Sequence, residues 1–141
     1  MEFFYSDQNL LTAFDAGLTR DEVRQALGWP SKVLPKTPFN KNEVDVFGAA
    51  MMRVWYDEKW TVEEVELYSP AASLVYRGEQ VLGVSMGCLK LALSSIGEEW
   101  IISESDECLT IAGGRIKFTV PDVAEDALST IVRAVCISIT P

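Results

Sequence analysis

A one-sided apolar stripe marks residues 19–27 as a helix. Apolar side chains recur there every three to four positions, and charged side chains fill the opposite side. Thr19 and Glu22 have the spacing of a capping box, in which each side chain accepts a hydrogen bond from the backbone N–H of the other residue. Gly28 follows at the position where helices commonly end. The pattern predicts a helix over 19–27.

The same pattern returns at residues 83–93. Laid over residues 17–27, this segment repeats an initial glycine, a hydroxyl residue two positions later and a closing Ala-Leu pair. The second copy has apolar side chains on nearly every side, which predicts a helix over 85–95 that is more buried than the first. The repeat indicates an internal duplication of the chain.

Apolar and β-branched runs follow each predicted helix and predict strands. The expected strands are 44–56, 61–68, 101–102, 108–112, 116–120 and 131–139. A bulge is expected at Gly48, within the first of them. Gly113 and Gly114 predict a hairpin with a two-residue turn, because such turns need positive φ. In 61–68 apolar residues are interspersed with glutamates, so one face of that strand is expected to be solvated.

These elements predict an α+β fold of two tandem units, each a helix followed by an antiparallel sheet. The first unit is expected over 1–70 and the second over 71–141, with the boundary at the Ser-Pro-Ala-Ala segment 69–72. The length of 141 residues and the hydrophobic content of 48% suffice for one core shared by both units. We therefore expect one compact domain.

The charge balance constrains the partner. Acidic residues number 21 and basic residues 12, which gives a net charge of −9. Nucleic acids and anionic membrane surfaces repel such a protein, so neither is expected as a direct partner. Two interpretations remain, simple solubility and complementarity to a basic partner. Eight acidic residues lie between 98 and 126, namely Glu98, Glu99, Glu104, Asp106, Glu107, Asp122, Glu125 and Asp126.

The residue types argue against an enzyme. The chain has no histidine and no recognised nucleophile motif, so neither a catalytic site nor a zinc site is expected. Adjacent carboxylates such as Glu63 and Glu64 could serve a glycosidase, but acids in such segments usually form a solvated face. No cofactor is predicted. Three cysteines without a CxxC pair indicate free thiols in a reducing compartment. With no signal peptide or membrane span recognised, a cytoplasmic location is expected.

Tryptophans beside carboxylates suggest where a partner would bind. A tryptophan flanked by acids is typical of interface hot spots, although the same arrangement also closes the edge of a core. Trp55 lies in the middle of a predicted strand and is expected in the core. The candidate partner-binding residues are Asp57, Glu58, Trp60, Glu98, Glu99, Trp100, Glu104, Asp106 and Glu107.

The segment from Gly17 to Pro30, with its Gly-Leu-Thr-x-x-Glu-Val-x-x-Ala-Leu-Gly-x-Pro pattern, resembles the start of the repeat in the bacterial small-lipoprotein and β-lactamase-inhibitor superfamily. That resemblance implies units made of a short helical segment and an antiparallel sheet, with two units in tandem in the inhibitors. The second copy has Ser-Ser-Ile where the first has its Gly-x-Pro ending.

In size, acidity and repeat, the chain is also similar to the immunity proteins of bacterial toxin systems, including contact-dependent inhibition. This similarity implies a non-catalytic protein that binds a cognate toxin, often a basic nuclease, and occludes its active site. The alternative is a homodimeric binding or assembly module that uses its sheet edges. An enzyme acting through carboxylates ranks third.

Overall fold

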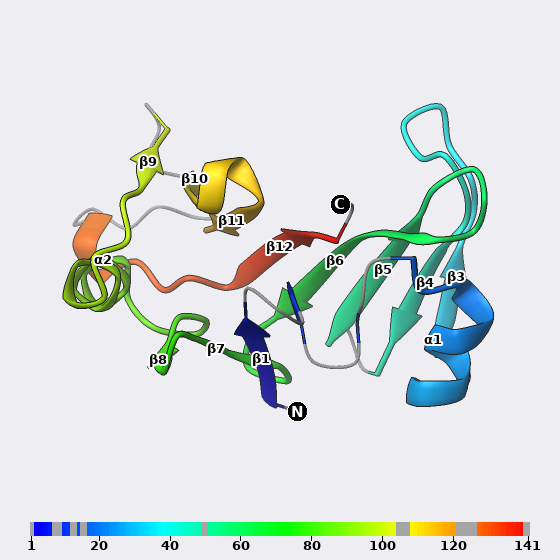
Figure 1. Cartoon of the computed structure of the whole chain (residues 1–141), viewed down its shortest axis with the longest axis horizontal. Helices are drawn as coiled ribbons and strands as arrows, with labels where there is room; N and C mark the ends of the chain where they lie inside the picture. The colour runs from blue at the N-terminus through cyan, green and yellow to red at the C-terminus, as the bar shows by residue number, and fades with distance from the viewer. Residues whose placement is uncertain are drawn as a thin grey trace.

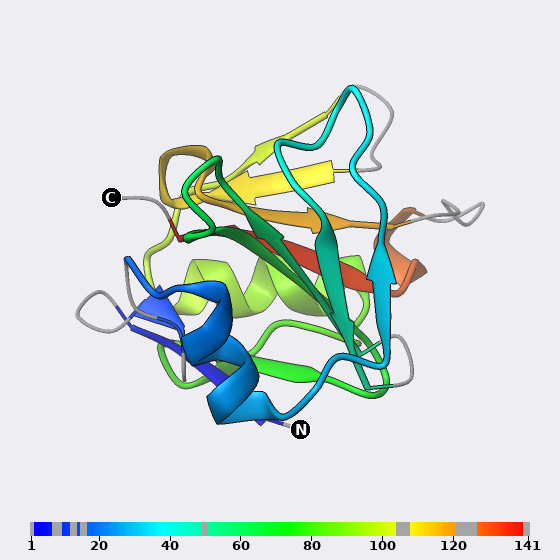
Figure 2. The same cartoon turned by 90° about the vertical axis from the view of Figure 1, so that its right-hand side faces the viewer.

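An antiparallel sheet of eight strands forms the body of the molecule (Figures 1 and 2). The computed structural model describes residues 2–6, 10–11, 14, 17–48, 51–103, 108–120 and 127–139. In spatial order the strands are β3 (Lys32–Leu34), β4 (Val44–Phe47), β5 (Met52–Tyr56), β6 (Val62–Tyr68), β12 (Ala134–Ser138), β11 (Ile116–Thr119), β10 (Cys108–Ile111) and β9 (Ile101–Ile102).

A second, smaller sheet and two helices cover one face of this sheet. The 4-stranded sheet has the order β2 (Leu10–Leu11), β1 (Glu2–Ser6), β7 (Ser73–Tyr76) and β8 (Glu79–Gln80), and β1 pairs with β7 in parallel. The helices are α1 (Arg20–Leu27) and α2 (Met86–Ser95), with short 3₁₀ turns at Ala112–Gly114 and Ala127–Ser129. In Figure 1, α1 lies at one end of the large sheet and α2 at the other.

Alternation of buried and partly exposed side chains separates an inner from an outer face of the large sheet, although all four residues of β4 are buried. On β5, Met52 and Val54 are buried, whereas Arg53 and Trp55 between them are partly exposed. The buried set pairs across the sheet in rows, one of which is Val54, Val65, Ile137, Ile116 and Ile111. These rows join Phe3 of β1, Leu74 of β7 and Leu89 of α2 in one core cluster. The inner face is therefore the core side.

Both predicted helices are confirmed. Thr19 caps α1 with a capping box, because its hydroxyl accepts from the Glu22 N–H at 3.3 Å and the Glu22 carboxylate accepts from the Thr19 N–H at 3.2 Å. Ser85 caps α2 by accepting from the Cys88 N–H at 3.1 Å. As predicted, α2 is the more buried helix, with three buried side chains against one in α1.

The predicted α+β fold of two tandem helix-then-sheet units is wrong. Strands dominate the described residues, and a strand pair precedes each helix: β1 and β2 before α1, β7 and β8 before α2. Those pairs combine into the small mixed sheet, and β6 pairs with β12, so strands before and after residue 70 share one continuous large sheet. Both helices were predicted correctly, but the fold class was inferred from them, and they are two short helices in a mostly β protein.

Two strand predictions also need correction. The segment 44–56 is a hairpin of β4 and β5 and not one strand, because Gly48, at φ 66°, lies in the turn instead of forming a bulge. The β10–β11 hairpin exists, but Ile111 pairs with Ile116, so its turn has four residues and not two. Ala112, Gly113 and Gly114 all have positive φ there. The two glycines predicted the position of the turn correctly but not its length.

A buried carboxylate fastens α1 to the inner face. Asp45 of β4 is fully buried in an otherwise apolar row, opposite Val54. Arg20 and Arg24, one helical turn apart, each donate two hydrogen bonds to its oxygens, at distances between 2.7 and 3.1 Å. The Tyr56 hydroxyl donates a fifth at 2.9 Å. The apolar stripe of this helix predicts a solvated side made of its charged residues, but two of them, Arg20 and Arg24, close the contact between helix and sheet.

Trp60 completes this contact from the turn between β5 and β6. The Arg20 guanidinium lies 4.5 Å from the centre of the Trp60 ring, and Arg24 lies 4.6 Å from the ring of Trp29. The Arg20 N–H donates to the Trp60 carbonyl at 3.0 Å. Two arginines are thus held between one carboxylate and aromatic rings, an arrangement that combines charge-assisted hydrogen bonds with cation–π contact.

This contact should make stability depend on acid pH. Burial alone raises the pKa of the Asp45 carboxyl, but hydrogen bonds from Arg20, Arg24 and Tyr56 outweigh it and hold the pKa below its ordinary value. A lowered folded-state pKa stabilises the fold above the unfolded value of about 4, and this stability is lost as pH falls through the folded pKa. In urea unfolding from pH 5 to pH 2, the stability difference between the wild type and Asp45→Ala should shrink toward acid. A difference that stays constant would contradict this.

Candidate functional site

The outer face of the large sheet carries polar and aromatic side chains in register. One complete cross-strand row consists of Lys32, Val46, Arg53, Glu66, Cys136, Lys117, Thr110 and Ile101. In the next row Trp55 of β5 faces Glu64 of β6, which in turn faces Ser138 of β12. Apart from Val46, which is buried, the side chains of both rows are partly or fully exposed. This face therefore offers a patterned surface and not a second core.

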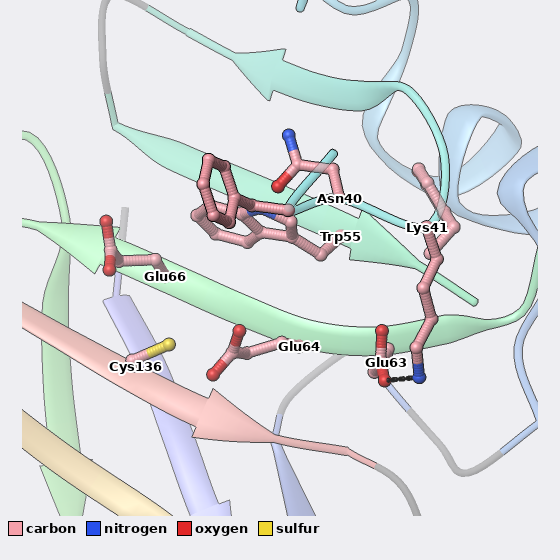
Figure 3. A pocket seen from close by; sticks show the side chains of 9 residues that line it. Asn40, Lys41, Trp55, Glu63, Glu64, Glu66 and Cys136 are labelled. Carbon is pink, nitrogen blue, oxygen red and sulfur yellow. Dashed lines mark hydrogen bonds and ion pairs between the residues drawn. The ribbon is translucent and has the colours of Figure 1, made fainter. Parts of the chain in front are cut away.

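A groove of about 350 Å³ lies on this face (Figure 3). Among the residues that line it are Phe39, Lys41, Trp55, Glu64, Glu66 and Cys136. Trp55 rises from β5, and the carboxylates of Glu64 and Glu66 stand on β6 beside it. Phe39, from the connection between β3 and β4, is 95% exposed. An aromatic surface and carboxylates thus share one groove.

The groove is electrostatically negative. Lys41 pairs with Glu63 at its end, which leaves Glu64 and Glu66 without a salt-bridge partner among the described residues. Burial raises the pKa of the Glu66 carboxyl, against the opposing effect of Arg53 and with the added effect of Glu64. Burial, a hydrogen bond to Glu64 and the charge on Glu64 raise the pKa of the Cys136 thiol. A cation entering the groove would offset the repulsion between the Glu64 and Glu66 carboxylates.

The thiol at the groove should be unreactive. Thiolates and not thiols are the nucleophiles, so a raised pKa slows alkylation at neutral pH. At pH 8, N-ethylmaleimide should label exposed Cys88 at least ~10-fold faster than Cys136, as read by mass spectrometry of the peptides. After unfolding in urea both cysteines should label alike. Equal labelling rates in the folded protein would contradict the environment described for Cys136.

The residues predicted from sequence do not form one surface. Asp57, Glu58 and Trp60 lie in the turn between β5 and β6, whereas Glu98, Glu99 and Trp100 lie between α2 and β9. Strands β12, β11 and β10 separate β6 from β9, and the two groups belong to opposite ends of the molecule (Figure 1). Glu104, Asp106 and Glu107 lie outside the described residues, as do Asp122, Glu125 and Asp126.

Several of those candidates have structural contacts instead. The Asp57 carboxylate accepts from the N–H groups of Lys59 and Thr61 and so shapes its own turn. Trp60 packs under Arg20, as described above, and Trp100 packs against the core cluster. Glu98 pairs with Arg77 at 3.1 Å. Glu58 and Glu99 are the exposed members of the two groups.

Sequence reasoning missed the groove itself. Trp55, expected in the core, lies on the outer face, because it occupies the alternate position to Val54 and Tyr56. The alternation of Glu64 and Glu66 with Val65 and Leu67 correctly indicated a solvated face on β6. The missing information was the pairing of β5 with β6 and of β6 with β12, which brings Trp55, Glu64 and Cys136 together.

Metal and membrane features are not found within the described ranges. No group of three or more His, Cys, Asp or Glu residues is arranged to hold a metal ion in that part of the chain. Neither α1 nor α2 has the length and apolar run needed to cross a bilayer, and the described residues contain no other α-helix.

Comparison with known proteins yields a likeness in structure. No protein-family model matches the chain. No curated protein matches it in sequence. In three dimensions it is similar to the crystal structure of the uncharacterized protein YfeY from Escherichia coli, with a TM-score of 0.53, 14% sequence identity and 98% of each chain covered. At this identity the likeness shows a shared, mostly β fold and carries no assignment of function.

Proposed function

We propose that this chain is a non-catalytic binding protein that uses the outer face of its large sheet to cover a basic partner protein. The partner we propose is a cognate bacterial toxin domain, which the chain would neutralise in the cytoplasm by blocking its active site. The single observation that carries this proposal is the groove beside Trp55, where the partly exposed Trp55 indole and the exposed Phe39 ring lie with carboxylates that form no salt bridge among the described residues.

Charge and shape both support a protein partner. The net charge of −9 favours docking of a basic surface and speeds encounter. The groove lies on the face of an eight-stranded sheet, which suits a protein surface better than an enclosed small molecule. Tryptophan with flanking charged residues is the composition of interface hot spots. Toxin neutralisation itself rests on similarity in size and charge to immunity proteins.

A homodimeric assembly module is the alternative. Its supporting observation is the edge strand β9, where Ile101 is 76% exposed and the strand has only two residues. Unpaired edge groups can pair with a second copy. That alternative requires a mass that rises with protein concentration and indifference to changes in the groove.

Co-expression tests the proposal. The tagged chain is produced together with the protein encoded by the adjacent gene, and the complex is purified at low and at high salt concentration. We expect a stoichiometric basic partner that dissociates at the higher salt, because charge attraction is screened, and whose toxicity the chain abolishes. Self-association alone, with no rescue of growth, would contradict the proposal and favour the homodimer.

A further inference from the structure

We propose that the groove beside Trp55 receives an arginine side chain of the partner. Its guanidinium would stack on the Trp55 indole and donate hydrogen bonds to the carboxylates of Glu64 and Glu66. This inference rests on the proposed function, since it names the chemistry that the outer face recognises. The partner is therefore a basic protein with an exposed arginine at the centre of its contact surface.

The register brings the required groups together. Trp55 and Glu64 are direct cross-strand partners, so their Cβ atoms lie roughly 5 Å apart. Glu66 stands two positions further along the same face of β6, about 7 Å from Glu64 along the strand. A planar cation over the indole therefore has one carboxylate beside it and a second within reach. The groove of about 350 Å³ has room for one guanidinium and part of its stem.

The molecule already holds its own arginines in this way. Arg20 sits 4.5 Å from the Trp60 ring centre while it donates to Asp45 at 2.7 Å. Arg24 sits 4.6 Å from the Trp29 ring centre while it donates to the same carboxylate at 2.8 Å. Both internal sites combine an indole with a carboxylate. The groove presents an indole and two carboxylates. Arg53 and Lys117 lie in the same cross-strand row as Glu66, but neither forms a salt bridge with it among the described residues, and the Arg53 guanidinium lies over the Tyr68 ring.

The geometry favours arginine over lysine. A guanidinium is planar, so it can lie flat on the indole and still direct its N–H groups in its own plane toward the carboxylates. An ammonium group is a compact, strongly hydrated charge and cannot stack. Lys41, which lines the groove, already forms an ion pair with Glu63. Recognition should therefore discriminate between the two basic side chains.

Three blocked pentapeptides test the site on the full chain without the partner. Gly-Gly-Xaa-Gly-Gly peptides with Xaa as arginine, lysine or neutral citrulline are titrated into ¹⁵N-labelled protein. The indole N–H signal of Trp55, assigned by its disappearance in Trp55→Phe, is followed by NMR. We expect saturable shifts with the arginine peptide, binding at least ~3-fold weaker with lysine, and none with citrulline.

Two double variants then locate the binding. Glu64→Gln/Glu66→Gln keeps side-chain size and should weaken the arginine peptide at least ~10-fold, since charge-assisted hydrogen bonds become neutral ones. The matched control Glu2→Gln/Asp21→Asn removes two exposed acids away from the outer face and should leave the affinity unchanged. Equal binding of all three peptides, or no effect of the groove variant, would overturn the inference.

The inference and the proposed function can fail separately. If the arginine peptide binds at Trp55 but no adjacent gene product does, the proposed partner is wrong and the site stands. If the partner binds with full affinity to Glu64→Gln/Glu66→Gln, the proposed function stands and the arginine site is refuted. If mass increases with concentration and the same variant abolishes this, the arginine comes from a second copy, which overturns the partner that we infer.

Discussion

Asp45→Ala should lower the free energy of unfolding by about 3–5 kcal/mol, the cost of breaking a buried ion pair by removing one partner. The Asp45 side chain is fully buried, and the side chains of Arg20 and Arg24 are only 14% and 15% exposed. Without the carboxylate, both guanidiniums and the Tyr56 hydroxyl lose their shared acceptor. Urea unfolding at pH 7, followed by tryptophan fluorescence, gives the difference.

Glu43→Ala is the matched control for that prediction. Glu43 also pairs with Arg20, but at 3.4 Å and with 47% of its side chain exposed. An exposed pair of this kind contributes at most about 1 kcal/mol. A loss for Asp45→Ala no larger than the loss for Glu43→Ala would contradict the account of how α1 is fastened to the sheet.

Charge reversal in the groove should have the largest effect on partner binding. In the double variant Glu64→Lys/Glu66→Lys, like charges would face a basic partner, which costs about 3 kcal/mol or more, or roughly a hundredfold in Kd. Both side chains are partly exposed on the outer face, so the fold should be retained, with a small loss of stability because Glu66→Lys sets a like charge opposite Arg53. Isothermal titration of the partner, at low and at high salt, measures the loss.

The control for this prediction is Glu2→Lys/Asp21→Lys. It changes the net charge of the chain by the same amount at two exposed positions away from the outer face. Its effect should be limited to slower encounter, within about a factor of three in Kd at physiological salt. A stronger loss for Glu58→Lys/Glu99→Lys than for the groove variant would contradict the groove and favour the surface predicted from sequence.

Local signals in the sequence predicted local structure well. The capping box of the first helix and the hydroxyl cap of the second predicted both helices to within a residue, and alternation on β6 predicted its solvated face. What failed was the inference from helices to fold class. Strand pairing between β1 and β7, and between β6 and β12, joins segments distant in the sequence, and no local pattern encodes such partners.

For the site too, local patterns were informative and contacts between distant segments were missed. In a strand, neighbouring side chains point to opposite faces, so Trp55 and Val54 cannot both face the core. The many apolar residues around Trp55 nevertheless favoured a core position for it. Arg20 and Arg24 looked like a solvated helix face because their partner, Asp45, lies 25 and 21 positions later. A buried acid within an apolar strand was the one signal that could have indicated this contact.

The central claim is that the outer face around Trp55 covers the partner, and hydroxyl-radical footprinting of the complex tests it most directly. Free and bound chains are oxidised briefly, and the modification of each aromatic residue and of Ile101 is read by mass spectrometry. Trp55 and Phe39 should lose reactivity on binding, whereas Trp29, which is 79% exposed beside α1, should keep it. Unchanged reactivity at Trp55, with protection at Ile101 or Trp29 instead, would contradict the account.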